Sequence, residues 1–171
     1  MSMETSPGLY CPGTAVKGIP TERTVIAAVI EWRGKIALFR RSKGVGYDSG
    51  LWHCISGFLE PGTAPERQAL EELSEETGLE AKDLLDLRPG PPLVIADSTG
   101  APWLVHTFTA VTTRRRLRLD WEHDSYRWAT ATKTKRFTNR VNWLDNVLEA
   151  TGHLPHVLSQ VQRTPAQQQE T

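Results

Sequence analysis

The chain has 171 residues, of which 39% are hydrophobic and 23% charged, and its 20 basic and 20 acidic side chains leave a net charge of zero. This length suits one folded domain, and the balanced charge gives no general attraction to nucleic acid or to an anionic membrane. No apolar run could span a bilayer, no secretory signal is visible, and Cys11 and Cys54 lack metal-binding spacing, so we expect a reduced, cytoplasmic protein without membrane or nucleic-acid partners.

In chain order, the predicted elements are short strands interrupted by one central helix and followed by another. Residues 1–22 carry irregularly spaced Pro and Gly and are expected to form an N-terminal arm. Strands are predicted at residues 24–32, 36–41, 52–56, 93–96, 102–111, 116–119 and 126–129, and a Gly-rich loop at 42–50. Helices are predicted at 65–78 and 139–151. The sequence therefore indicates an α/β (α+β) domain at 23–152, with a mixed sheet between helices, and a disordered tail at 153–171.

The central helix has recognisable signals at both ends. Thr63 and Glu66 have the spacing of a capping box, in which Thr63 would cap the first turn and Glu66 would reach back. Gly78 is a typical residue just beyond a helix C-terminus. At 100° per residue, Leu70, Leu73 and Thr77 share one side, which is the predicted core face.

A second face of this helix is unusually acidic. Seven glutamates occur from position 60 to position 80, and Arg67 is the one basic residue in that interval. Glu72, Glu75 and Glu76 stand at i, i+3 and i+4, where like charges destabilise a helix. A solvated acidic face would normally carry interleaved basic residues. Converging carboxylates would instead suit a hard divalent cation, with a backbone carbonyl from the preceding turn as a further ligand.

The stretch from residue 57 to 79, GFLEPGTAPERQALEELSEETGL, resembles the Nudix box, G-x5-E-x7-R-E-U-x-E-E-x-G-U, where U is a bulky apolar residue. The matching positions are Gly57, Glu72, Leu73, Glu75, Glu76, Gly78 and Leu79. The resemblance covers about residues 22–152. It implies a Nudix-type α/β/α sandwich with a mixed β-sheet, which hydrolyses a nucleoside diphosphate linked to another moiety with Mg²⁺ or Mn²⁺.

The resemblance also implies roles for individual residues. Glu72, Glu75 and Glu76 would be catalytic residues that hold the metal, and the Gly57 carbonyl would be an additional ligand. Many Nudix enzymes take a general base from outside the box, and Glu122 is our candidate. The alternative for Glu122 is an ion pair with Arg127 or another nearby arginine.

Substrate binding is predicted beside this site. Arg40 and Arg41 end a strand and would hold a phosphate, unless they form a solvated strand end. Trp52 would stack on a base, unless it packs in the core. The segments WEHDSYRW and RFTNRVNWLDNVLE are similar to the C-terminal part of dihydroneopterin triphosphate pyrophosphatases, which favours a nucleoside or pterin triphosphate. The expected partner is such a small nucleotide or diphosphate substrate, and a homodimer remains open.

Two positions depart from the box. Thr63 stands where the family has Glu, and Glu71 where it has Arg, a pair that typically braces the loop against the helix. Their loss predicts lower activity, and leaves open a degenerate domain that binds a nucleotide without cleaving it. A third alternative is a relative of isopentenyl diphosphate isomerase, which would use Cys54 as an acid/base.

Overall fold

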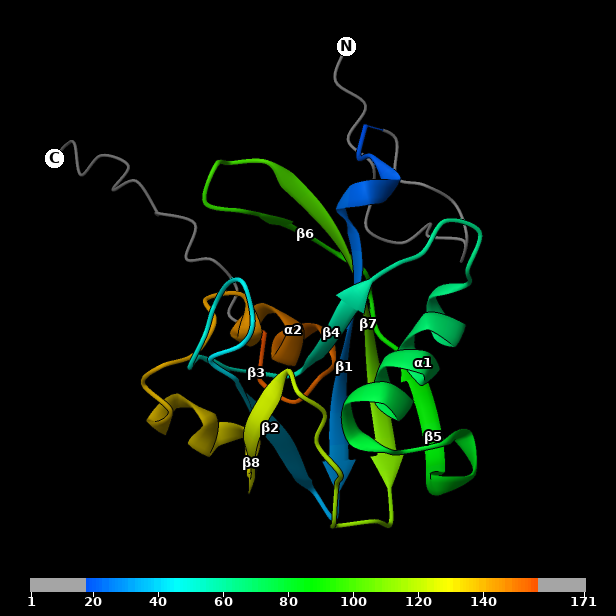
Figure 1. Cartoon of the computed structure of the whole chain (residues 1–171), viewed down its shortest axis with the longest axis vertical. Coiled ribbons are helices and arrows are strands. Elements are labelled where there is room, and N and C mark those ends of the chain that lie inside the picture. The colour runs from blue at the N-terminus through cyan, green and yellow to red at the C-terminus, as the bar shows by residue number, and fades with distance from the viewer. Residues whose placement is uncertain (1–17, 157–171) are drawn as a thin grey trace, which may run out of the picture.

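The computed structural model describes residues 18–156, which form a mixed sheet with one helix on each face (Figure 1). The strands are β1 (Thr24–Trp32), β2 (Lys35–Arg41), β3 (Trp52–His53), β4 (Ile55–Phe58), β5 (Leu84–Pro89), β6 (Leu93–Ala96), β7 (Pro102–Thr112) and β8 (His123–Ala129). The helices are α1 (Pro65–Thr77) and α2 (Leu144–Ala150), with 3₁₀ turns η1 (Thr21–Arg23), η2 (Ala81–Asp83) and η3 (Ala131–Arg136). This arrangement confirms the predicted fold class.

The centre of the sheet is the parallel pair of β1 and β7, which runs from Thr24 opposite Leu104 to Glu31 opposite Val111. The other pairings are antiparallel, and the order is β3-β2-β1-β7-β5. In addition, β4 pairs with β1, β6 with β7, and β8 with β2. The residues of β1 read as a continuous apolar run because this central strand is covered on both faces.

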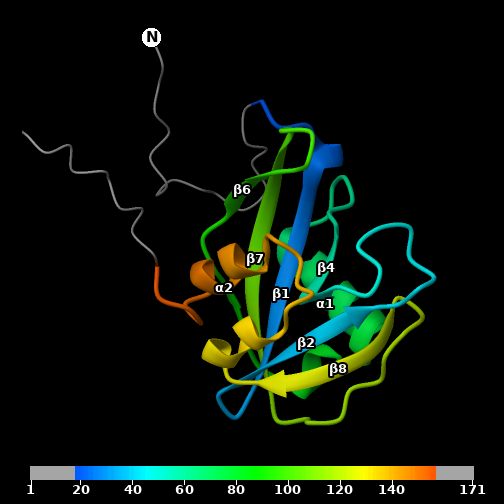
Figure 2. The same cartoon turned by 90° about the vertical axis from the view of Figure 1, so that its left-hand side faces the viewer.

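Two clusters of buried side chains, one on each side of the sheet, hold the helices in place. On one side, Ala69 and Leu73 of α1 pack with β-strand residues such as Ile26 and Phe108. On the other, Leu144, Val147 and Leu148 of α2 pack with Val29 and Leu38 among others. Figure 2 shows α1 and α2 separated by β1 and β7. The packing of α1 on one face of the sheet therefore fixes the position of the other residues of that helix.

Most predicted strands are present. Residues 24–32, 93–96 and 102–111 coincide with β1, β6 and β7, and the Gly-rich stretch at 42–50 is a loop. The strand predicted at 52–56 is divided at Cys54, because β3 pairs with β2 whereas β4 pairs with β1. This division turns the chain from one part of the sheet to the next, just before Gly57.

Several predicted boundaries are wrong. Residues 116–119 form no strand; Leu117 is buried, and its backbone N–H donates to the Tyr126 hydroxyl. Strand β5 was not predicted, because the exposed Asp86 and Arg88 interrupt its apolar residues and leave no run typical of a buried strand. Helix α2 begins only at Leu144, because Asn139 and Val141 exchange backbone hydrogen bonds with Trp52.

Helix α1 differs from prediction at its N-terminus. The residue at the N-cap position is Ala64, and no side chain caps the helix, so the capping box of Thr63 and Glu66 is wrong. Pro65 at the first helical position needs no hydrogen-bond partner for its nitrogen. Gly78 adopts the left-handed conformation with φ 72°, as predicted. On the core face, Leu73 and Thr77 are buried, while Leu70 is only partly buried.

The ends of the domain are described only in part. Residues 1–17 of the expected arm and 157–171 of the expected tail lie outside the described residues. Beyond residue 152, Leu154 is buried and His153 contacts Glu31 at 3.0 Å, so these two residues belong to the packed domain. Within residues 18–156, no helix combines the length and the apolar character needed to cross a membrane.

Candidate functional site

The candidate site begins where β4 meets α1. The carboxylate of Glu72 occupies the space that a Cβ on Gly57 would fill, so this position accepts only glycine without displacing Glu72. Glu76, one turn further, is 2% exposed, and its Oε2 atom has no hydrogen-bond partner. Glu75 is exposed. The three box glutamates thus occur on one helix in three environments: half-buried, exposed and buried.

Crowding and burial alter the acidity of these carboxyl groups. Burial, together with the charges of Glu72, Glu122 and Asp120, raises the pKa of Glu76 to about 10, although the charge of Arg41 opposes the rise. Burial likewise raises the pKa of Glu72 to about 7, although a hydrogen bond from Gln68 opposes the rise. Such shifts in a cluster of carboxyls are typical of a functional site.

Glu122 approaches the same cluster from another part of the chain. It directly precedes β8, and burial and the charge of Asp120 raise its pKa. Its charge in turn raises the pKa of both Glu72 and Glu76. Among residues 18–156, no ion pair involves Glu122, and Arg127 donates instead to Ser125 and to the Tyr126 carbonyl. The alternative of an ion pair with Arg127 is therefore wrong.

The segment that carries Glu122 is fixed by hydrogen bonds. The Asp120 carboxylate accepts from the Glu122 backbone N–H at 3.2 Å and contacts Nδ1 of His123 at the same distance. The Nε2 atoms of His123 and His53 lie 2.7 Å apart in the interior. Ser42 adds two bonds, from its N–H to the Glu122 carbonyl and from its hydroxyl to the Trp121 carbonyl. The segment around Glu122 is thus held by Ser42, directly after β2, and by His53 of β3.

Arg41 connects the acidic cluster to a basic pocket. Its side chain is 6% exposed, stacks on the Tyr47 ring at 4.6 Å and donates to the Tyr47 carbonyl. Its charge lowers the pKa of Glu76 and of Glu122. Arg41 is therefore a buried cation that interacts with the carboxylates, and the alternative of a solvated strand end is wrong for this residue.

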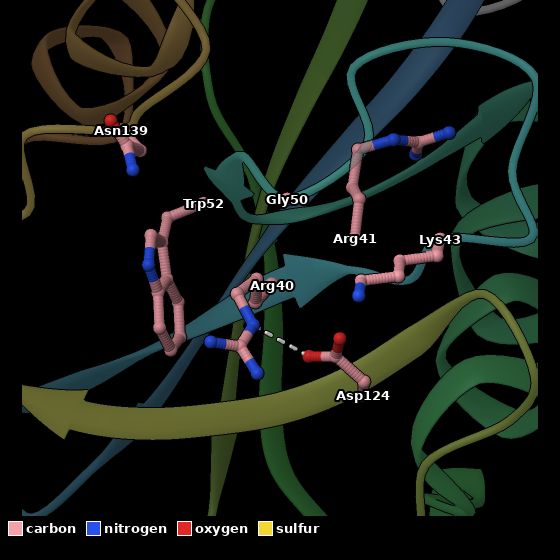
Figure 3. Close-up of a pocket in the computed structure, with 7 residues that line it drawn as sticks. All are labelled: Arg40, Arg41, Lys43, Gly50, Trp52, Asp124 and Asn139. Carbon is pink, nitrogen blue, oxygen red and sulfur yellow. Dashed lines mark hydrogen bonds and ion pairs between the residues drawn. The ribbon is translucent and has the colours of Figure 1, made fainter.

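The pocket has a volume of about 400 Å³ and lies at the end of β2 (Figure 3). Its lining residues are Arg40, Arg41, Lys43, Gly50, Trp52, Asp124 and Asn139. Arg40 donates to Asp124 at 2.7 Å and lies 5.8 Å above the Trp52 ring. The Trp52 ring also contacts the Phe137 ring edge-on, with the ring centroids 5.0 Å apart. The three residues predicted to bind substrate, Arg40, Arg41 and Trp52, are thus brought together.

One residue of the site was not predicted from the sequence. Gln68 is 4% exposed, accepts a hydrogen bond from the Glu60 backbone N–H and donates one to Glu72 Oε1, both at 3.1 Å. A polar residue one turn before Glu72, on the buried side of an amphipathic helix, was the available signal. Arg67 and Glu71, in contrast, form an exposed ion pair on the outer surface of α1.

Cys54 has the opposite character to a catalytic thiol. Its side chain is fully buried in the cluster on the α2 side of the sheet, and burial raises its pKa to about 12. A group of this kind neither meets a ligand nor exchanges a proton near neutral pH. The structure therefore gives no support to the isomerase alternative.

The donors at this site suit a hard divalent cation. They are carboxylate oxygens and a backbone carbonyl, and the unpartnered Oε2 of Glu76 is a buried acceptor that requires a cationic or hydrogen-bonding partner. Within residues 18–156, no three His, Cys, Asp or Glu side chains already stand in a metal-binding arrangement.

Comparison with solved structures identifies the same fold in other proteins. Dihydroneopterin triphosphate pyrophosphohydrolase of E. coli aligns with a TM-score of 0.63 and 18% identity over 77% of this chain and 95% of its own. The MutT protein of Methanosarcina mazei aligns with a TM-score of 0.62 and 21% identity over 74% of this chain and 89% of its own. The NUDIX domain of Shewanella oneidensis NrtR, complexed with ADP ribose, aligns with a TM-score of 0.60 and 16% identity over 81% of this chain and 92% of its own.

Curated sequences match over shorter stretches. The octanoyltransferase of Myxococcus xanthus is 35% identical over 120 residues, which are 64% of this chain and 31% of that protein. Nudix hydrolase 19, chloroplastic, of Arabidopsis thaliana is 38% identical over 61 residues, 36% of this chain and 14% of its own. The chain thus spans less than a third of the length of these relatives. The family model of the NUDIX domain matches residues 20–150, and the chain therefore belongs to the Nudix family.

Proposed function

We propose that this protein hydrolyses a pyrophosphate linkage in a nucleoside or pterin triphosphate, or in a nucleoside diphosphate derivative, with Mg²⁺ or Mn²⁺. The observation that carries the proposal is the buried carboxyl of Glu76, whose Oε2 atom has no hydrogen-bond partner. This carboxyl belongs to the same cluster as Glu72, which lies against Gly57, and Glu122. Arg41 compensates the negative charge of this cluster only in part, since the pKa of Glu76 is still raised, and carboxylates buried in this way reduce stability. A bound divalent cation would offset that cost.

Each residue of the cluster has a distinct task in this proposal. Glu72, Glu75, Glu76 and the Gly57 carbonyl hold the cation, which when bound neutralises charge on the pyrophosphate oxygens. Glu122 accepts a proton from the attacking water, whose oxygen forms the new bond to phosphorus as the bridging P–O bond breaks. Positioning and electrostatics supply most of the rate in such reactions.

The basic pocket would receive the substrate next to this cluster. Arg41 lines the pocket and also interacts with Glu76 and Glu122, so phosphates held by Arg41 and Lys43 would lie against the carboxylates. Trp52 would stack on the base or pterin ring, and Asn139 offers an amide to its edge. A volume of about 400 Å³ suits a ligand of this size.

The test is release of phosphate or pyrophosphate from a panel of nucleotides and dihydroneopterin triphosphate, with Mg²⁺ and with Mn²⁺. Glu76→Gln should abolish release, whereas Glu66→Gln, on the exposed first turn of the same helix, should leave it unchanged. Trp52→Leu should raise KM more than it lowers kcat. If the wild type binds a nucleotide and releases nothing with either metal, the protein is a binding domain and the proposal fails.

A further inference from the structure

The loop before α1 and the carboxylate of Glu72 are joined by one side chain, Gln68. Its amide oxygen accepts from the Glu60 backbone N–H, and its amide nitrogen donates to Glu72 Oε1. Only this orientation satisfies both contacts, because a backbone N–H needs an acceptor and a carboxylate needs a donor. With 4% of its surface exposed, Gln68 has little freedom to exchange these partners for water.

The box positions that depart from the family pattern do not provide such a link. Glu71 pairs with Arg67 on the exposed surface of α1. Thr63 is not the N-cap residue, and its hydroxyl makes no hydrogen bond within residues 18–156. Gln68 is therefore the side chain that connects the loop carrying Glu60 to the row of glutamates.

We propose that Gln68 is a positioning residue, which fixes Glu72 over Gly57 and anchors the preceding loop, so that the glutamates retain a metal-binding arrangement without the family's Glu–Arg pair. A neutral amide suits this task, because Glu71, Glu75 and Glu122 already surround Glu72 with negative charge. The inference rests on the proposed function, since it assigns Glu72 to the metal.

The test substitutes Gln68 by Met, which has a similar length and no hydrogen-bonding amide. In the metal-free protein, exchange of the Glu60 amide hydrogen, followed by NMR, should become about tenfold faster. Affinity for Mn²⁺ alone, measured by calorimetry, should fall by about 10- to 100-fold, as should kcat, with KM nearly unchanged. The control is Arg67→Met, on the adjacent exposed position, which should alter none of these.

A second variant covers the case in which Gln68→Met fails to fold. Gln68→Asn keeps the amide but shortens its reach by one methylene, so it cannot span both contacts, and the same losses are expected. A further chain combines Gln68→Met with Thr63→Glu and Glu71→Arg, and should regain Mn²⁺ affinity and kcat.

Three results would overturn the inference: unchanged Glu60 exchange in both variants, unchanged Mn²⁺ affinity while the wild type binds Mn²⁺, or no regain in the combined chain. A wild type that hydrolyses no substrate contradicts the proposed function instead, and leaves Gln68 to be judged by amide exchange and Mn²⁺ affinity.

Discussion

The carboxylate of Glu72 fills the position that a Cβ on Gly57 would take. Gly57→Ala should therefore push the end of a flexible side chain aside, with a change in unfolding free energy below about 1 kcal/mol. Mn²⁺ affinity should nevertheless fall by about 10- to 100-fold, since the displaced group is a proposed ligand. Gly46→Ala, in a loop with open space around the added methyl, is the control. Equal Mn²⁺ affinity in both variants would contradict this role of the glycine.

Glu76→Gln should stabilise the metal-free protein while it abolishes tight Mn²⁺ binding. The pKa of Glu76 is raised in the folded state, so the fold binds a proton there that the unfolded chain releases above about pH 4.5. This difference reduces stability as pH rises toward 10, and its removal should add about 1 to 3 kcal/mol at pH 8. Urea denaturation at pH 5 and pH 8 is the measurement, and a gain that does not increase with pH would refute the prediction.

Thr63→Ala should change the unfolding free energy by less than about 0.5 kcal/mol, because Thr63 does not cap α1. Gly78→Ala provides the contrast at the other end of the helix. It places a side chain in the left-handed conformation and should cost about 1 to 2 kcal/mol. A loss near 1 kcal/mol for Thr63→Ala would restore the capping interpretation.

Acidification should weaken the fold through the buried pair of His53 and His123. Burial lowers the pKa of both rings; the charges of His123 and Arg41 lower that of His53 further, whereas Asp120 raises that of His123. The unfolded chain therefore binds more protons below about pH 6.5, and stability falls as pH drops through that value, by up to about 1.4 kcal/mol per pH unit and group.

The measurement for this pair compares variants between pH 7 and pH 5. His53→Phe should show a shallower fall in unfolding free energy than the wild type, because one titrating ring is gone and the carboxylates are unchanged. His156→Gln removes a histidine from the exposed surface and should keep the wild-type slope. A steeper slope in His53→Phe would show that the pair does not resist protonation.

The positions of the candidate residues could be predicted from the sequence better than the bounds of the elements around them. The spacing of Glu72, Glu75 and Glu76 is a local property of one helix, and Gly57 lies in the adjacent turn, so a linear pattern suffices to place them. Glu122 could be proposed because it precedes an evident strand. Gln68 could not be, because its two contacts depend on how the loop at Glu60 folds back over the helix.

Two of the errors in the predicted elements are caused by tertiary contacts. The run at residues 116–119 alternates like a strand, but Leu117 reaches the core as an irregular segment. The start of α2 was predicted too early because backbone bonds to Trp52 hold residues 139–141 extended. The turn before α1 needs no side-chain cap, since Ala64 and Pro65 already set its backbone. The first two differences depend on contacts with other segments of the chain, whereas the third is local.

The parallel pairing of β1 with β7 also determines how much of the chain must be synthesised before the candidate site can fold. Thr24 pairs with Leu104, which is synthesised about 80 residues later, and pairing between such distant residues makes folding slow. Until β7 leaves the ribosome, α1 lacks Phe108 and Ala110 beneath it, and its acidic side chains stay in water. Glu122 is translated later still. A nascent chain therefore carries the whole Nudix box before the candidate site is formed, and the proposed cation could bind only after most of the domain has been synthesised.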